Sequence, residues 1–146
     1  MKRDYPDRPI VAVGVVVIRN HQVLLIRRGK PPKPDQWSIP GGAQEIGETV
    51  VEAAVREVAE ETAITINAPR FLDILDFIDK DEDKHIRHHY TLVDYAATYR
   101  SGEIHPGDDA QEAIWVPLHQ LSEYNLWTET EHMIHKAIRL LTEETP

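Results

Sequence analysis

Glutamate side chains are crowded near the end of one helical segment of the sequence. The stretch 49–62 reads TVVEAAVREVAEET and places Glu57, Glu60 and Glu61 in its last turns. Residues three or four positions apart share one face of a helix, so these carboxylates should project together. Like charges at this spacing, at the negative end of the helix dipole, are unfavourable. Mg²⁺ prefers oxygen ligands and would turn the repulsion into attraction, so the cluster predicts a metal site.

The neighbours of the acids decide between a metal site and an ordinary solvated acidic face, which is the commoner meaning of such runs. Gly41 and Gly42 carry no side chain, so their backbone can approach the helix and direct a carbonyl at the same cation. Arg56 can pair with Glu48 or with Glu52 and brace the acids from the side. These neighbours favour the metal interpretation.

The helix that carries the acids has a clear start signal. Thr49 is followed three positions later by a glutamate, which is a capping-box arrangement and predicts a helix over 49–62. Val51, Val55 and Val58 lie roughly opposite the acids. We expect this valine stripe to pack inward against a sheet.

The remaining elements follow from hydrophobic periodicity and from turn residues. Strands are expected over 10–28 as a hairpin that turns at 19–22, over 71–78, over 88–99 and over 112–118, and an amphipathic helix is expected over 129–141. The proline- and glycine-rich stretch 29–42 is expected to be a surface loop anchored by Trp37 and Ile39. This order of elements predicts an α+β fold, with helices packed on a mixed β-sheet, in a single domain over 1–146.

Composition narrows the classes of function. The formal net charge of −9 argues against a general nucleic-acid-binding surface, because neutralising phosphates requires excess Lys and Arg. The chain has no cysteine, so a metal would be held by oxygen or imidazole. The N-terminal stretch MKRDYPDRPI lacks the apolar segment of a signal peptide or membrane span, so we expect a cytoplasmic protein that does not bind membranes.

The acidic helix and the glycines before it resemble the Nudix box. That pattern reads Gly, five residues, Glu, seven residues, Arg-Glu, an aliphatic residue, any residue, Glu-Glu, any residue, Gly, aliphatic. The matching positions are Gly42, Glu48, Arg56, Glu57, Val58, Glu60, Glu61 and Ile64. Ala63 departs from the pattern, which has glycine there. The stretches WSIPGG and EAIWVPL resemble the flanks of the box, so the likeness covers roughly residues 10–140.

The resemblance implies a Nudix-type α/β/α sandwich and an enzyme. Nudix hydrolases cleave a diphosphate linkage in a nucleoside diphosphate joined to another group, using Mg²⁺ or Mn²⁺. Carried onto this chain, the likeness implies metal ligation by the Gly41 carbonyl, Glu57 and Glu61. It implies that Glu60 is a further ligand or a carboxylate base, and Arg56 belongs to the same catalytic group.

Residues outside the box are candidates for substrate contact. Arg28 matches a family position that can contact substrate phosphate, although a strand-end cation at the surface is an equal alternative. The stretch PGDDAQEAIW offers a further carboxylate, for which Asp109 is favoured over a merely solvated loop. Aromatic side chains that could stack on a base, or else belong to the core, are Trp37, Phe71, Tyr124 and Trp127.

Substrate is the least determined feature. The stretches LVDYAA and GDDAQEAIWV are most similar to ADP-ribose hydrolases, which favours an ADP-ribose-like nucleotide sugar. One ADP-ribose group carries a proline where this chain has Lys80, and the NADH-hydrolysis marker is absent too. The alternative is a MutT-like enzyme acting on nucleoside triphosphates, including 8-oxo-dGTP, although Thr130 stands where such enzymes can carry a base-reading asparagine. A non-catalytic nucleotide-binding Nudix domain is the alternative of another class, and a homodimer is left open.

Overall fold

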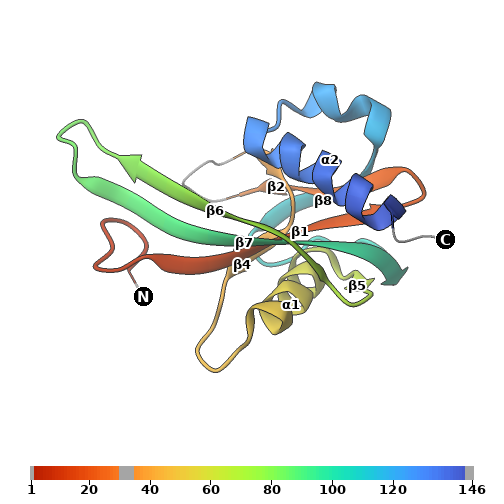
Figure 1. Cartoon of the computed structure of the whole chain (residues 1–146), viewed down its shortest axis with the longest axis horizontal. Helices are drawn as coiled ribbons and strands as arrows, with labels where there is room; N and C mark the ends of the chain where they lie inside the picture. Colours follow the sequence, from red (N-terminus) through yellow and green to blue (C-terminus); the bar gives the residue numbers. More distant parts are fainter. Residues whose placement is uncertain (1, 30–34, 144–146) are drawn as a thin grey trace.

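The structure, a computed structural model that describes residues 2–29 and 35–143, is built around one mixed sheet with a helix on each face (Figure 1). The sheet has eight strands. Its elements in chain order are β1 (Ile10–Arg19), β2 (Gln22–Arg28), β3 (Trp37–Ser38), β4 (Gly41–Ala43), α1 (Val50–Thr62), β5 (Thr65–Ile66), β6 (Arg70–Lys80), β7 (Ile86–Ser101), β8 (Ala110–Pro117), the 3₁₀ helix η1 (Leu118–Tyr124) and α2 (Thr128–Glu143). The expected mixed sheet flanked by helices is confirmed.

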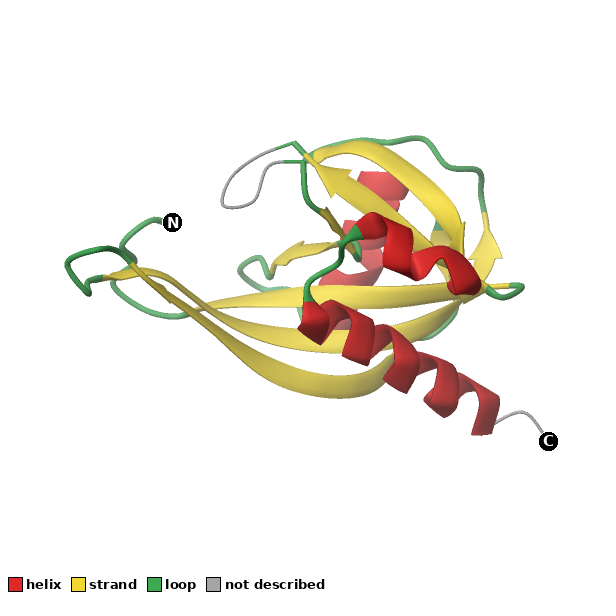
Figure 2. Ribbon diagram, turned by 90° about the horizontal axis from the view of Figure 1, so that it is seen from above, coloured by secondary structure: helices red, strands yellow, loops and turns green. Residues whose placement is uncertain are grey.

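Strands β1 and β7 form the centre of the sheet and run parallel, from Ile10 opposite Tyr90 to Ile18 opposite Thr98. The other described strand pairs are antiparallel, with β6 on the far side of β7 and β8 beyond β2. Helix α1 lies behind this sheet and α2 lies in front of it (Figure 2). The long β6–β7 hairpin extends past both helices at the left of Figure 1.

Two hydrophobic cores fill the spaces between the sheet and its helices. Alternate residues of β1 supply both: Val15 packs towards α1, whereas Val16 packs towards α2. This two-sided burial explains why the β1 stretch IVAVGVVVI is almost continuously apolar. On α2, Met133, Ile134 and Ala137 are buried, so the predicted apolar face of that helix is confirmed.

Strands β1 and β2 pair near their turn and diverge further on, and β4 pairs with β1 in the part where they diverge. The turn is the expected one, with Asn20 and His21 both in the left-handed region. The two strands pair near this turn, while β4 pairs with β1 further on, with Gly41 opposite Gly14. The expectation of a plain loop over 29–42 was therefore wrong for its second half. Trp37–Ser38 pairs with β2 as β3, and the glycines of β4 can lie close against β1 because they have no side chain. Residues 30–34 of that stretch lie outside the described residues.

Helix α1 begins as expected and buries a different face from the expected one. Both hydrogen bonds of the capping box at Thr49 are present. The valine stripe was predicted wrongly: Val51 is 42% exposed and Val55 is 37% exposed, and of the three valines only Val58 is buried. The buried face instead contains Glu57 and Glu61, because α1 is rotated to turn these acids towards β4.

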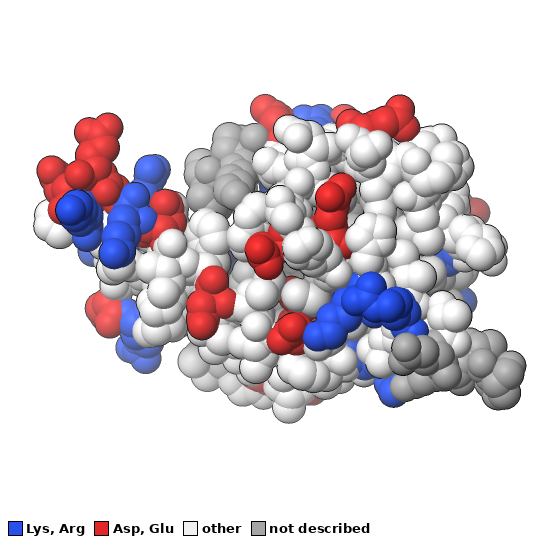
Figure 3. Space-filling view, turned by 45° about the horizontal axis from the view of Figure 1, so that its top comes forward, with Lys and Arg blue, Asp and Glu red and all other residues white. Residues whose placement is uncertain are grey.

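Charge is spread over the molecule in separate groups. On the face shown in Figure 3, separate acidic groups lie across the middle, a basic group lies at the lower right, and the projecting end carries both signs. The helices among the described residues include none that is long and apolar enough to cross a membrane. An anionic ligand that approaches this face meets no continuous basic field.

The end of α1 yields a first prediction. Ala63 adopts the left-handed conformation, with φ 67°, that the glycine of the box pattern would adopt without strain. We expect Ala63→Gly to raise the free energy of unfolding by about 1 kcal/mol, because the strain of an L-residue at this angle is removed. Urea denaturation measures the change.

The matched control is Ala59→Gly, at an exposed position inside the same helix. This substitution should lower the free energy of unfolding by about 1 kcal/mol. A loss of similar size in both variants would contradict the left-handed end of α1.

Candidate active site

The acids of α1 lie directly against the backbone of β4. Glu61 is 1% exposed, and its Oε1 accepts a hydrogen bond from the Gly41 N–H at 2.7 Å. Glu57 is 6% exposed, and a Cβ at Gly42 would lie 2.6 Å from its carboxylate oxygens. A side chain at position 42 would therefore displace Glu57, which explains the glycine before the helix. The predicted close approach of these glycines to α1 is confirmed.

Arg56 holds several of these carboxylates in place. Its Nη1 donates to Glu57 Oε1 at 2.7 Å and to Glu60 Oε2 at 3.1 Å, while its Nη2 donates to Glu48 Oε1 at 2.9 Å. Nη2 also donates to the Ala43 carbonyl of β4 at 3.0 Å. Hydrogen bonds to Glu48, more than any other cause, raise the pKa of Arg56. Of the two partners expected for Arg56, Glu48 forms the bridge.

Burial makes the two inward acids hard to ionise. Desolvation raises the pKa of Glu57, against an opposing effect of the Arg56 hydrogen bond. Desolvation raises the pKa of Glu61 to about 8, although the charge of Arg28 and the Gly41 N–H act in the other direction. Because these carboxylates are largely dehydrated, a cation that binds directly to their oxygens would stabilise their ionised form.

Asp108 joins the acids of α1 from a distant loop. Carboxylate oxygens of Glu57, Glu60 and Asp108 lie within 4.8 Å of one another, so the three can hold one metal ion. Gly107 fixes this loop: its N–H donates to the Glu61 carbonyl at 3.1 Å, and a Cβ there would lie 2.6 Å from the Glu60 carbonyl. The expectation that Asp109 supplies the further carboxylate was therefore wrong for this group of three: its neighbour Asp108 lies with Glu57 and Glu60, and Asp109 lines the adjoining groove.

The acids open onto a groove of about 1020 Å³. Arg28, at the end of β2, and Asp109 line this groove together with the carboxylates. The Nη2 of Arg28 lies 3.4 Å from the Gly41 carbonyl, so its charge sits where a bound phosphate would approach the acids. All the predicted site residues therefore border one groove or, for Glu61, lie directly beneath it.

Aromatic side chains divide between the groove and the core. Trp37 borders the groove but is packed edge-on against Tyr124, with ring centroids 5.3 Å apart. Trp127 also lines it and is packed edge-on against Phe77. Phe71 packs on a tyrosine of β7 and does not line the groove. Of the four aromatic candidates from the sequence, Trp127 is therefore the one that is both exposed and in the lining of the groove.

A smaller cavity of about 160 Å³ adjoins the groove and contains an acid that sequence reasoning missed. Asp94 of β7 is 6% exposed, and among the described residues it has no hydrogen-bond partner. Desolvation raises its pKa to about 7, and the nearby charge of Asp73 on β6 adds to the rise. Arg28 of β2 and Glu129 of α2 line the same cavity. The signal in the sequence was one aspartate inside the otherwise apolar and aromatic stretch LVDYAA.

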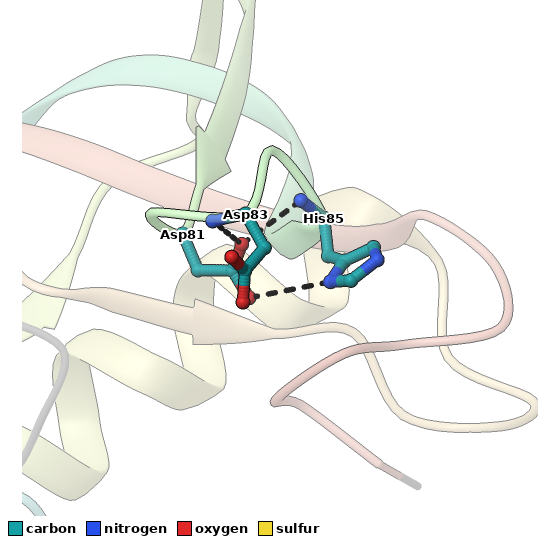
Figure 4. Close-up of side chains that lie close together, drawn as sticks. All are labelled: Asp81, Asp83 and His85. Atoms are coloured by element: carbon teal, nitrogen blue, oxygen red, sulfur yellow. Dashed lines mark hydrogen bonds and ion pairs between the residues drawn. The ribbon is translucent and has the colours of Figure 1, made fainter.

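A second group of metal-ligand residue types has a structural explanation. Asp81, Asp83 and His85 lie together in the β6–β7 turn (Figure 4). The Oδ1 of Asp81 accepts backbone hydrogen bonds from Asp83 and His85, each at 2.9 Å, and its Oδ2 accepts one from the Tyr5 hydroxyl. These bonds close the turn and attach the N-terminal segment to it.

Comparison with known proteins agrees with this geometry. A NUDIX domain model matches residues 8–137. The chain belongs to the NUDIX domain family. It is 35% identical over 113 residues to the ADP-ribose pyrophosphatase of Methanocaldococcus jannaschii, covering 77% of this chain and 64% of that one, and thus spans less than two thirds of that relative.

Two further NUDIX relatives match over nearly their whole length. The 8-oxo-dGTP diphosphatase of Escherichia coli strain K12 is 29% identical over 133 residues, covering 89% of this chain and 96% of that protein. The crystal structure of a MutT NUDIX hydrolase from Burkholderia pseudomallei superposes with a TM-score of 0.77 at 27% identity, covering 89% and 98% of the two chains. The sandwich described above is therefore the fold of this family.

The unpartnered acid yields a prediction about pH. The unfolded chain releases the Asp94 proton near the usual pKa of 3.8 and the folded protein near 7, so stability falls as pH rises between these values. We expect Asp94→Asn to raise the free energy of unfolding at pH 8 by on the order of 4 kcal/mol and to leave it nearly unchanged at pH 3.5.

Urea melts of both proteins across this range give the difference, in which the other titrating groups largely cancel. A constant difference between pH 3.5 and pH 8 would mean that Asp94 is as well solvated as an ordinary surface acid.

Proposed function

We propose that the protein hydrolyses a diphosphate linkage in a nucleoside diphosphate derivative, with an ADP-ribose-like nucleotide sugar as the first choice of substrate. The products would be a nucleoside monophosphate and a sugar phosphate. One observation carries the proposal: the carboxylates of Glu57 and Glu60, with Asp108, converge beside the groove that Arg28 lines. The likeness to the ADP-ribose pyrophosphatase of M. jannaschii supports the choice of substrate.

The donor set suits Mg²⁺ or Mn²⁺. Hard oxygen donors from Glu57, Glu60 and Asp108, with the Gly41 carbonyl and Glu61 beside them, match the preference of these ions. The absence of a Cβ at position 42 leaves the Glu57 carboxylate room beside the backbone of β4. When bound, such a cation would neutralise diphosphate charge and lower the pKa of a coordinated water.

The chain's own residues then have distinct tasks. Arg56 orients Glu57 and Glu60 and offsets their mutual repulsion. Arg28 offers its guanidinium to a substrate phosphate, and Asp109 borders the same part of the groove. Glu60 is more exposed than Glu57 and Glu61 and would therefore be the one of these three to take a proton from an attacking water.

The alternative substrate is a nucleoside triphosphate such as 8-oxo-dGTP. It is favoured by the likeness to the E. coli 8-oxo-dGTP diphosphatase, which this chain matches over nearly its whole length. Both substrates present a diphosphate to the same acids, so the choice depends on the base and on the group beyond the second phosphate. A small-molecule nucleotide is the partner in either case, and we propose no nucleic-acid or membrane partner.

The role of the buried acids can be tested by removing charge without changing shape. We expect Glu57→Gln and Glu61→Gln each to reduce kcat by at least about a hundredfold, because an amide binds a divalent cation poorly. Thermal melts should show that both variants remain folded, since burying an amide costs less than burying a carboxylate. Steady-state assays with Mg²⁺, and with the metal removed by EDTA, measure the effect.

Glu123→Gln, at an exposed acid outside the groove, is the matched control and should retain full activity. Turnover near the wild-type rate in either α1 variant would remove these acids from the mechanism.

A substrate panel distinguishes the two enzyme proposals from a non-catalytic domain. ADP-ribose, NADH, diadenosine polyphosphates, dNTPs and 8-oxo-dGTP would be assayed with Mg²⁺, and the released phosphates quantified. We expect the highest kcat/KM for ADP-ribose. Turnover of dNTPs without turnover of ADP-ribose would reverse the order of the two substrates. Nucleotide binding without hydrolysis of any compound would indicate a binding domain.

A further inference from the structure

The cavity beside Asp94 is not needed for the chemistry proposed at α1. Its walls are mainly apolar, from Ile39, Leu75, Leu92 and Met133, and Asp94 is the buried acid among them. Described side-chain oxygens that are fully cut off from solvent all have hydrogen-bond partners, so the carboxyl of Asp94, which has none, reaches the open space of the cavity. An apolar pocket with one converging polar group is typical of a ligand subsite.

The sheet itself makes room for this acid. Gly14 of β1 pairs with Asp94 of β7 on one side and with Gly41 of β4 on the other. A Cβ at Gly14 would lie 2.5 Å from Asp94 Oδ1 and 3.1 Å from Ile39 Cδ1. The missing side chain therefore allows the carboxyl to lie over the strand at the bottom of the cavity.

The cavity and the groove are connected. Arg28, Gly41, Trp127 and Thr130 line both of them. Two strand spacings separate Asp94 from Gly41, which is roughly 10 Å. The exocyclic amino group of a purine nucleotide and its phosphate are separated by a comparable distance, because the base and the ribose both lie between them. A cavity of about 160 Å³ holds one planar ring system, and the rest of a nucleotide would extend towards the acids of α1.

We propose that Asp94 determines substrate specificity by accepting a hydrogen bond from the exocyclic amino group of a purine base inserted into this cavity. The proposal rests on the proposed function, because it concerns the nucleoside part of the same substrate. Trp127 at the shared rim offers its indole to the face of the base, and Arg28 meets the first phosphate.

An unpartnered buried acid discriminates strongly between bases. It gains a hydrogen bond when an amino group enters, whereas a base without one leaves the carboxyl both dehydrated and unpaired. The carboxyl can accept from an amino group whether or not it is ionised, since one oxygen remains an acceptor in either state. Preference for an amino-bearing base therefore holds on both sides of neutral pH.

The test uses binding of a reaction product, so that it does not depend on turnover. AMP and purine riboside 5′-monophosphate differ only by the 6-amino group, and isothermal titration calorimetry gives a dissociation constant for each. The wild-type protein should bind AMP about tenfold or more tightly. Asp94→Leu should bring the ratio near one, whereas Asp94→Asn, whose amide oxygen accepts a hydrogen bond, should retain most of it.

Two neighbouring acids serve as matched controls. Asp73→Asn removes the acid opposite Asp94 on β6, which does not line the cavity, and should leave the ratio unchanged. Glu129→Gln changes the other acid of the cavity and should also leave the ratio unchanged. Loss of the ratio in Glu129→Gln with retention in Asp94→Leu would overturn the assignment. Equal binding of the two nucleotides by the wild-type protein would also overturn it.

Folding failure of the leucine variant leaves the test intact, because Asp94→Ala also removes the side-chain acceptor and leaves more space. If no diphosphate substrate is hydrolysed but the binding ratio depends on Asp94, the base-reading role stands without the enzyme. If ADP-ribose is hydrolysed and the ratio of the two dissociation constants is unchanged in the Asp94 variants, the proposed enzymatic function is retained and the base-reading role of Asp94 is rejected.

Discussion

The close approach of α1 to β4 is the constraint on which the rest of the structure depends. A Cβ at Gly41 would lie 2.1 Å from the Val13 carbonyl, and one at Gly42 would meet the Glu57 carboxylate. Because neither side chain exists, the helix can place Glu57 and Glu61 against a polar backbone edge. The apolar core on the same side of α1 is then left to small residues, Ala53 and Ala54 among them. The fold thus gives up hydrophobic burial on this helix in order to enclose charge.

Enclosed charge needs a fixed counter-charge, and Arg56 provides it. The guanidinium donates hydrogen bonds to Glu48 in the loop before α1, to Glu57 and Glu60 on the helix and to a backbone carbonyl of β4. It therefore also ties this loop to the helix. Such multiple contacts limit the freedom of each acid, which matters more for the geometry of a ligand shell than for overall stability. Arg28 adds a second positive charge to the same groove, close to the Gly41 carbonyl.

Elements with regular periodicity and local end signals could be predicted from the sequence, and elements defined by distant contacts could not. Thr49 marks the start of α1 through bonds to its own first turn, and α2 has an ordinary apolar face. The buried face of α1 was predicted wrongly because apolar residues are usually buried and acids exposed. Here β4 donates a backbone N–H to Glu61, which makes burial of the acid possible. The residues of β4 carry no local strand signal, because β4 can pair with β1 only where β1 and β2 diverge beyond their turn. The spacing of the α1 acids predicted that they project together, whereas the positions of Asp94 and Asp108 depend on how β1, β7 and the loop before β8 come together.

The parallel pairing of β1 with β7 has a consequence for biosynthesis. Ile10 pairs with Tyr90, so β1 leaves the ribosome well before its central partner β7 has been synthesised. Until then β2, β4 and α1 are neighbours of β1 that can already cover its valines, whereas α2, which completes the second core, emerges later still. Pairing across so many residues also slows folding, because the intervening loop must be closed first. The nascent chain is therefore expected to depend on chaperones most strongly before β7 emerges.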